Sequence, residues 1–157
     1  KNEVIKNSKI FFDQRNKNLN DFPKASKNEY YKIQNSLQND LTALVIVDYP
    51  VLFDFKKNLI YAADLFGTAG FKNIDKINSA DELRKYLLKM DISYIVYSYK
   101  RRAGFTKSIE KSNINSYRPE IKIPSLIQSK FLILLEEIVL NSKRIYKTDN
   151  NLVIEIK

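Results

Sequence analysis

An apolar run at residues 41–47, Leu-Thr-Ala-Leu-Val-Ile-Val, stops abruptly at Asp48, Tyr49 and Pro50. A run this short and this rich in Val and Ile is typical of a strand that is buried on both faces. Such strands occur in parallel or mixed sheets that have helices on both sides. The run therefore predicts an α/β fold. It also makes Asp48 and Tyr49 candidate binding residues, because ligands of open α/β sheets usually bind beyond the carboxyl ends of the strands.

Helix signals alternate with strand signals along the rest of the chain. Ser26 with Glu29, and Ser79 with Glu82, have the spacing of capping boxes, and apolar side chains at helical spacing follow each pair. Segments rich in β-branched and aromatic residues follow the helices. The expected elements are helices near residues 27–38, 80–90 and 125–141 and strands near 43–48, 59–63, 92–99, 144–147 and 152–156. Together they predict a layered mixed β-sheet of about five strands, flanked by helices and closed by a C-terminal β-hairpin.

Length and residue types limit both the organisation and the chemistry of the chain. With 157 residues we expect a single α/β domain at residues 26–157, preceded by a polar N-terminal arm at residues 1–25. The chain has no Cys and no His, which excludes thiol nucleophiles, disulfides, imidazole bases and the common zinc sites. Carboxylates, Lys, Arg, Tyr and Ser remain for any chemistry, and no cofactor and no metal are expected.

Further candidate binding residues follow the second and third expected strands. Asp64 ends the second strand and precedes Gly67, in a loop whose two glycines allow backbone conformations closed to other residues. Lys100, Arg101 and Arg102 open a long basic connection after the third strand, and the planar guanidinium group suits bidentate binding of phosphate or carboxylate. The formal net charge of +9 likewise permits nucleic acid, anionic lipid headgroups or phosphorylated ligands as partners.

Each of these candidates also has a purely structural explanation. An Asp before a turn and a Pro often ends a strand by a local hydrogen bond, and Gly-x-x-Gly falls far short of a nucleotide-binding fingerprint. A run of charges is most often a solvated loop. A different alternative is a metal-dependent nuclease or other nucleic-acid binder. Asp54 and Lys56 favour the nuclease, because they have the D-x-K spacing that places an acid and a lysine on one face of a strand. Asp40 or Asp48 would supply the second ligand for Mg²⁺.

Several segments share their order with a known family of membrane enzymes. They are the helix from Tyr30 to Leu37, the strand Ala43-Leu-Val-Ile-Val-Asp-Tyr-Pro50, the stretch Ala63-Asp-Leu-Phe-Gly67, the unit Ser79 to Leu87 before Ile92 to Tyr97, and the closing strands Arg144 to Lys147 and Leu152 to Ile156. From about Asn28 to Lys157 the chain resembles the C-terminal extracytoplasmic domain of bacterial polytopic glycosyltransferases related to dolichyl-phosphate-mannose protein mannosyltransferases. The resemblance includes no catalytic motif.

The resemblance implies a parent enzyme that transfers a sugar from a polyprenyl-phosphate donor, with its catalytic acids in a membrane-side loop that this chain does not contain. No catalytic residue is therefore assigned. The chain would be a noncatalytic soluble domain on the periplasmic or outer face, tethered to the inner membrane through its parent. Its partners would be the transmembrane remainder of the parent chain, the acceptor molecule, and an anionic lipid headgroup or the polyprenyl-phosphate sugar. Nucleic acid is not expected.

The ends of the chain and its hydropathy agree with this expectation. The sequence begins at Lys1 rather than Met and has no apolar run near the ~20 residues that span a bilayer, as expected for a piece of a longer protein. The alternative is a free-standing α/β domain that binds a small anionic ligand or a protein. Several bilayer-length apolar helices encoded upstream of Lys1 would distinguish the two.

Overall fold

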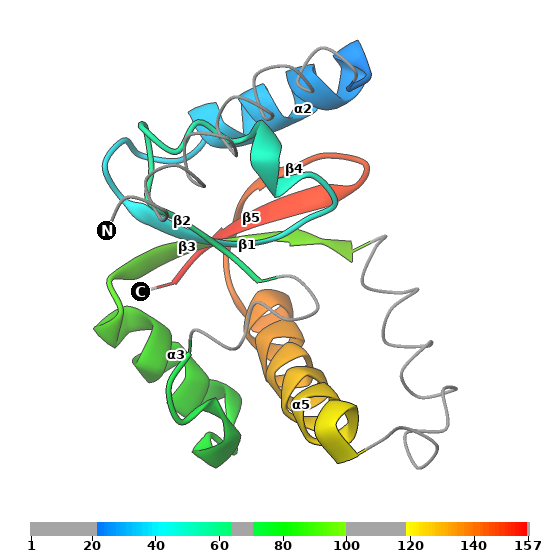
Figure 1. Cartoon of the computed structure of the whole chain (residues 1–157). Helices are drawn as coiled ribbons and strands as arrows, with labels where there is room; N and C mark the ends of the chain where they lie inside the picture. Colours follow the sequence, from blue (N-terminus) through cyan, green and yellow to red (C-terminus); the bar gives the residue numbers. More distant parts are fainter. Residues whose placement is uncertain (1–21, 64–70, 100–118, 157) are drawn as a thin grey trace, which may run out of the picture.

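Five strands form one mixed sheet at the centre of the molecule (Figure 1). The computed structural model describes residues 22–63, 71–99 and 119–156. In spatial order the strands are β2 (Ile60–Ala62), β1 (Thr42–Ile46), β3 (Ile92–Ser98), β5 (Asn151–Glu155) and β4 (Arg144–Lys147). β1 pairs in parallel with β2 and with β3, whereas β5 pairs in antiparallel fashion with β3 and with β4. The α/β fold, the mixed sheet and the C-terminal hairpin predicted from the sequence are confirmed.

Helices cover both faces of this sheet and give the molecule three layers (Figure 1). α2 (Lys24–Asn35) lies on one face, together with the short 3₁₀ helix η2 (Pro50–Leu52). α3 (Ala80–Lys89) and α5 (Pro119–Asn141) lie on the other face, where the 3₁₀ helix η4 (Ile74–Lys76) leads into α3. In the described ranges, no helix combines the length and the hydrophobicity needed to cross a membrane.

β1 is buried along its whole length, as its apolar run predicts. Leu44 faces the larger core, which fills the space between the sheet and α3 and α5, whereas Val45 faces the smaller core under α2. Each fully buried Leu or Val side chain contributes about 1.5–3 kcal/mol relative to an exposed one. Because both faces of β1 are buried, apolar side chains are favoured at successive positions, which explains the absence of alternation from Ala43 to Ile46.

The two expected capping boxes have different outcomes. Ser79 is the N-cap of α3 and accepts a hydrogen bond from the backbone N–H of Glu82 at 3.2 Å, as predicted. The box at Ser26 is wrong, because α2 begins earlier, at Lys24, with Pro23 as its N-cap residue and no side-chain cap. Ser26 therefore lies inside the first turn. The carboxylate of Glu29 makes long-range contacts in place of the expected capping bond.

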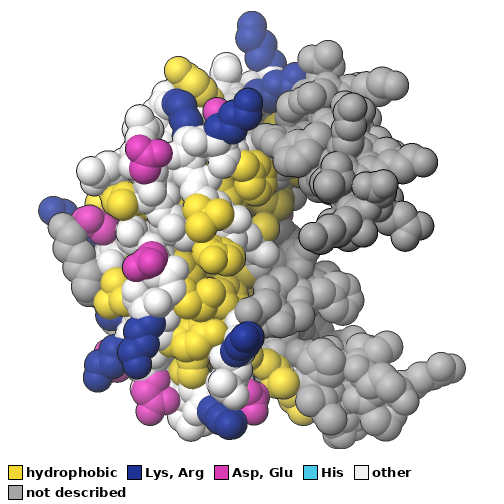
Figure 2. Space-filling view, turned by 60° about the vertical axis from the view of Figure 1, so that its left-hand side comes forward, with side chains coloured by type: hydrophobic (Ala, Val, Ile, Leu, Met, Phe, Trp, Pro, Cys, Tyr) yellow, Lys and Arg dark blue, Asp and Glu magenta, His cyan; other side chains and the backbone are white. Residues whose placement is uncertain are grey.

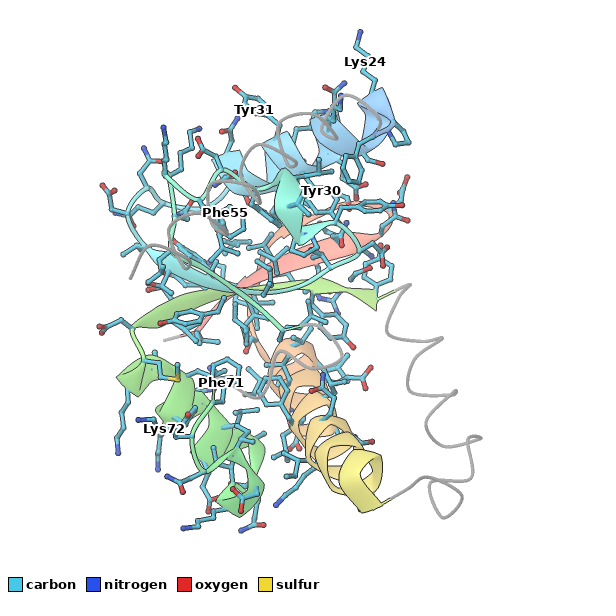
Figure 3. The ribbon with its side chains drawn as sticks, viewed as in Figure 1. Lys24, Tyr30, Tyr31, Phe55, Phe71 and Lys72 are labelled. Carbon is cyan, nitrogen blue, oxygen red and sulfur yellow. The ribbon has the colours of Figure 1, made fainter. Side chains whose placement is uncertain are left out.

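Tyr30 and Tyr31 are neighbours on α2 with opposite environments (Figure 3). Tyr30 points toward the sheet and is only 3% exposed, whereas Tyr31 points away from it and is 65% exposed. This difference follows from the helical period, because adjacent residues lie about 100° apart around a helix axis. Tyr30 therefore belongs to the smaller core, and Tyr31 belongs to the surface.

Candidate functional site

The carboxyl ends of β1, β2 and β3 meet at one edge of the sheet, because the three strands are parallel. Ile46 at the end of β1 is paired with Tyr97 near the end of β3, so the residues after β1 lie level with the end of β3. β5 runs in the opposite direction and enters the sheet at this same edge, where Asn151 is paired with Ser98. We call this edge, with the residues that adjoin it, the carboxyl edge.

The structure places two of the expected binding residues at the carboxyl edge. Asp48 and Tyr49 follow β1, and both are exposed. The other candidates, Asp64, Gly67, Lys100, Arg101 and Arg102, lie outside the described residues, as do most of the N-terminal arm and the greater part of the basic connection after β3. The expectation that Asp48 and Tyr49 bind a ligand stays a prediction.

Glu29 fastens α2 to the turn between β4 and β5. Its carboxylate accepts hydrogen bonds from the hydroxyl of Thr148, from Asn150 Nδ2 at 3.2 Å and from Asn151 Nδ2 at 2.9 Å. Hydrogen bonds to an ionised carboxylate are roughly twice as strong as those between neutral groups. Glu29 therefore places a negative charge, held by three donors, beside the point where β5 enters the sheet.

Tyr30 fastens the same helix to the exit of β1. Its phenolic oxygen accepts a hydrogen bond from the backbone N–H of Tyr49 at 3.0 Å, and its ring packs edge-on against Phe53 with 5.3 Å between centroids. Burial is the largest cause that raises the pKa of Tyr30 to about 12, partly opposed by the hydrogen bond from Tyr49 and increased by the negative charge of Asp48. The phenol therefore keeps its proton at neutral pH.

Two buried polar atoms at the carboxyl edge lack hydrogen-bond partners among the described residues: Ser98 Oγ and Asn151 Oδ1. Ser98 is fully buried and Asn151 is 3% exposed. Ser98 is two residues after Val96 in β3, and Asn151 is two residues before Val153 in β5. Val96 and Val153 belong to the smaller core, so the side chains of Ser98 and Asn151 face the α2 side of the sheet as well. Because Ser98 and Asn151 are directly opposite each other on adjacent strands, their Cβ atoms lie about 4.5–5.5 Å apart.

Unpaired buried polar atoms are rare in native proteins, and each calls for an explanation. Within the described ranges, Ser98 Oγ and Asn151 Oδ1 are the side-chain atoms with this property. They occur side by side, next to the carboxylate of Glu29. A hydroxyl or amino group of a ligand, or an ordered water that a ligand contacts, would satisfy both atoms. The carboxyl edge therefore contains a buried pair of polar atoms whose hydrogen-bonding capacity the described residues do not use.

The D-x-K spacing of Asp54 and Lys56 has a local explanation. The two residues lie in the turn between η2 and β2, where Asp54 Oδ1 accepts a hydrogen bond from the backbone N–H of Lys56 at 2.9 Å. The expectation that they share one face of a strand is wrong. Asp40 precedes β1 and Asp48 follows it, so the proposed second ligands lie at opposite ends of a strand. The described residues contain no group of three or more acids that could hold a metal ion.

Charges of both signs are mixed on the face of the molecule that Figure 2 shows. A band of hydrophobic side chains runs down this face, and lysine or arginine side chains lie on either side of it, interspersed with acids. Proteins that bind nucleic acid through its phosphates gather their cations in one patch or stripe. The described part of this face has no such single-sign patch.

Sequence patterns did not reveal the residues that build most of the carboxyl edge. Glu29 fits the spacing of a capping box, Tyr30 lies in an expected helix, and Asn151 falls just before the strand expected at residues 152–156. Ser98 is the exception that a pattern could have indicated, since a small polar residue near the end of a buried strand is the same kind of signal as Asp48 after β1.

Comparisons with known proteins give no match for this chain. No protein-family model, no curated protein and no solved structure matches it. A functional proposal for this chain therefore depends on the chemistry of its residues and on the order of its elements.

Proposed function

We propose that this chain is a noncatalytic extracytoplasmic domain of a polytopic membrane glycosyltransferase, and that its carboxyl edge helps to bind the acceptor or the headgroup of the lipid-linked sugar. The parent protein would use a polyprenyl-phosphate sugar as donor, and the chain's first partner would be the transmembrane remainder of that parent. The helices and strands on which the resemblance rests occur in the same order in the structure, apart from the stretch from Asp64 to Gly67, which lies outside the described residues.

The observation that carries the binding role is the pair of unpartnered atoms, Ser98 Oγ and Asn151 Oδ1, beside the carboxylate of Glu29. Sugars and headgroups present several hydroxyls, which donate to a carboxylate or an amide oxygen and accept from a serine hydroxyl. A site with both kinds of group at a sheet edge suits such a ligand better than it suits an apolar one. Asp48 and Tyr49 at the rim provide further polar groups.

Sugar transfer by the parent enzyme tests this role. Deletion of the domain, or Ser98→Ala within it, should lower transfer from a polyprenyl-phosphate sugar at limiting acceptor or donor, by about tenfold for the loss of about 1.4 kcal/mol of binding. Ser93→Ala, at the opposite end of β3, is the matched control and should leave transfer unchanged. Unchanged transfer and acceptor choice after deletion would overturn the proposal.

The alternative of a free-standing α/β domain uses the same edge to bind a small polar or anionic ligand. The reading frame upstream of Lys1 separates the two functions. Bilayer-length apolar helices there support the glycosyltransferase parent, whereas a start codon immediately before Lys1 supports the free-standing domain.

A further inference from the structure

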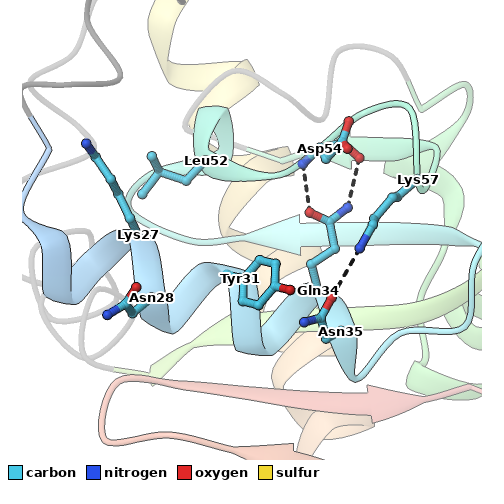
Figure 4. A pocket seen from close by; sticks show the side chains of 8 residues that line it. All are labelled: Lys27, Asn28, Tyr31, Gln34, Asn35, Leu52, Asp54 and Lys57. Atoms are coloured by element: carbon cyan, nitrogen blue, oxygen red, sulfur yellow. Dashed lines mark hydrogen bonds between the residues drawn. The ribbon is translucent and has the colours of Figure 1, made fainter.

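A groove of about 440 Å³ lies between α2 and the connection from β1 to β2 (Figure 4). Its volume is in the range of small-molecule sites, roughly 300–1,000 Å³. The residues that line it are Lys27, Asn28, Tyr31, Gln34, Asn35, Leu52, Asp54 and Lys57. We call it the helix groove. It is separate from the unpartnered atoms of the carboxyl edge, because none of its lining residues belongs to β3 or β5.

The two walls of the helix groove are fastened to each other by Gln34. Its amide Nε2 donates to the backbone oxygen of Asp54 at 2.8 Å, and its Oε1 accepts from the backbone N–H of Asp54 at 2.7 Å (Figure 4). Gln34 is 6% exposed, so these bonds are shielded from water. The connection opposite α2 is therefore held in place, and the groove exists without a ligand to form it.

Asn58 also holds the connection between β1 and β2 against the C-terminal end of α2. Its side-chain Nδ2 donates to the backbone oxygens of Gln38 at 2.8 Å and Leu41 at 2.9 Å, and its Oδ1 accepts from Gln34 Nε2 at 3.3 Å. Asn58 is only 2% exposed. A preformed pocket with a rigid wall loses little conformational entropy when a ligand enters, which favours binding.

Lys27, Tyr31 and Asn35 follow one line along α2, because they are spaced four residues apart. The Tyr31 ring is 65% exposed and lies between the two cations of the groove, Lys27 and Lys57 (Figure 4). Lys57 Nζ lies 5.9 Å from the Tyr31 ring centroid and donates to Asn35 Oδ1 at 3.2 Å. One acid, Asp54, lines the groove, and one of its oxygens is engaged by the backbone of Lys56.

An exposed aromatic ring, two cations and the side-chain amides of Asn28 and Asn35 in one groove fit a particular ligand chemistry. The ring and Leu52 offer apolar surface for the carbon face of a small ring. The amides of Asn28 and Asn35 both donate and accept, which suits hydroxyls. The lysines supply compact positive charge for a phosphate. A hydroxylated ring that carries one phosphate uses all three kinds of group.

We propose that the helix groove binds a sugar phosphate, with the phosphate near Lys57 and the sugar ring against Tyr31. This inference deepens the proposed function, on which it rests for the biological source of the ligand. The same chemistry occurs in a free sugar phosphate and in the headgroup of a lipid-linked sugar. Binding to the first requires only the groove, whereas binding to the second also requires that the groove be reachable from a bilayer.

An NMR titration of the full chain, residues 1–157, tests the proposal. Glucose 1-phosphate should cause saturable shifts of backbone amides at residues 27–35 and 52–57. Glucose alone and inorganic phosphate alone should each bind at least about tenfold more weakly, since each loses one set of contacts worth about 1.4 kcal/mol. Phosphatidylcholine vesicles with and without polyprenyl-phosphate glucose distinguish the lipid-linked source from the free one.

Exposed side chains allow variants that leave the fold intact. Tyr31→Ala and Lys57→Gln should each weaken glucose 1-phosphate binding by about tenfold. Tyr61→Ala and Lys85→Gln, exposed residues outside the groove, are the matched controls and should bind normally. Absence of saturable shifts, equal affinity for phosphate alone, or full binding by Lys57→Gln would each overturn the proposal. Such failure leaves the effect of Ser98→Ala on sugar transfer untouched, so the two proposals fail separately.

Discussion

Glu29 Oε1 accepts a hydrogen bond from Asn151 Nδ2 at 2.9 Å, although 122 positions separate the two residues in the sequence. The contact joins the first helix described by the structure to the last strand. With the bonds from Thr148 and Asn150, it makes one carboxylate the link between α2 and the β4–β5 turn. The carboxyl edge of the sheet therefore depends on the docking of a helix that is remote from β5 in sequence.

Removal of this carboxylate should destabilise the fold. Glu29→Ala leaves the donors of Thr148, Asn150 and Asn151 without their acceptor, and unsatisfied buried groups cost about 1–3 kcal/mol each. Urea unfolding should therefore show a lower free energy of unfolding, by about 1–3 kcal/mol in total because the turn can relax toward water. Glu137→Ala, which removes an exposed acid from α5, should change the stability by less than about 0.5 kcal/mol. Equal effects of the two variants would contradict this role of Glu29.

Unlike Glu29→Ala, the variant Ser98→Ala should not destabilise the ligand-free domain. Ser98 Oγ is buried and has no partner among the described residues, so its removal takes away a desolvation cost and no hydrogen bond. We expect the free energy of unfolding of the ligand-free domain to stay within about 1 kcal/mol of the original value or to rise. Thermal unfolding with and without a bound ligand provides the measurement. A loss of several kcal/mol without ligand would mean that the hydroxyl has a structural partner.

Sequence patterns predicted the elements whose signals are local. The apolar run before Asp48 gave β1 because a strand buried on both faces leaves no polar alternation, and the alternation of turn residues with β-branched residues gave the C-terminal hairpin. The contacts of Glu29 had no local signature, since its partners lie 119 to 122 positions away. The long helix α5 begins at Pro119, six residues before the start near residue 125 that the sequence pattern predicts.

Ser79 and Ser26, the two serines with the spacing of a capping box in the sequence, give a matched pair of variants. Ser79→Ala removes a side-chain acceptor from the N-terminus of α3 and should lower the free energy of unfolding by about 1 kcal/mol. Ser26→Ala lies within the first turn of α2, where Pro23 is the N-cap residue, and should cost less than about 0.5 kcal/mol. Chemical denaturation of both variants measures the difference. A larger effect at Ser26 would show that α2 starts later than the structure indicates.

The buried phenol of Tyr30 should make stability fall at alkaline pH. In the unfolded chain Tyr30 loses its proton near the ordinary tyrosine pKa of 10.0, whereas burial keeps the folded group protonated up to about pH 12. Between these values the unfolded state binds fewer protons than the folded state, so the free energy of unfolding decreases as pH rises. Tyr30→Phe cannot ionise and loses this component, although it also loses the acceptor for the Tyr49 N–H at a cost of about 1 kcal/mol. The stability advantage of the original protein over Tyr30→Phe, measured by urea unfolding from neutral pH to pH 12, should therefore shrink above pH 10.

Tyr31→Phe, on the exposed side of the same helix, is the matched control. Parallel curves for the original protein and Tyr30→Phe across this range would mean that the phenol of Tyr30 is not buried as described.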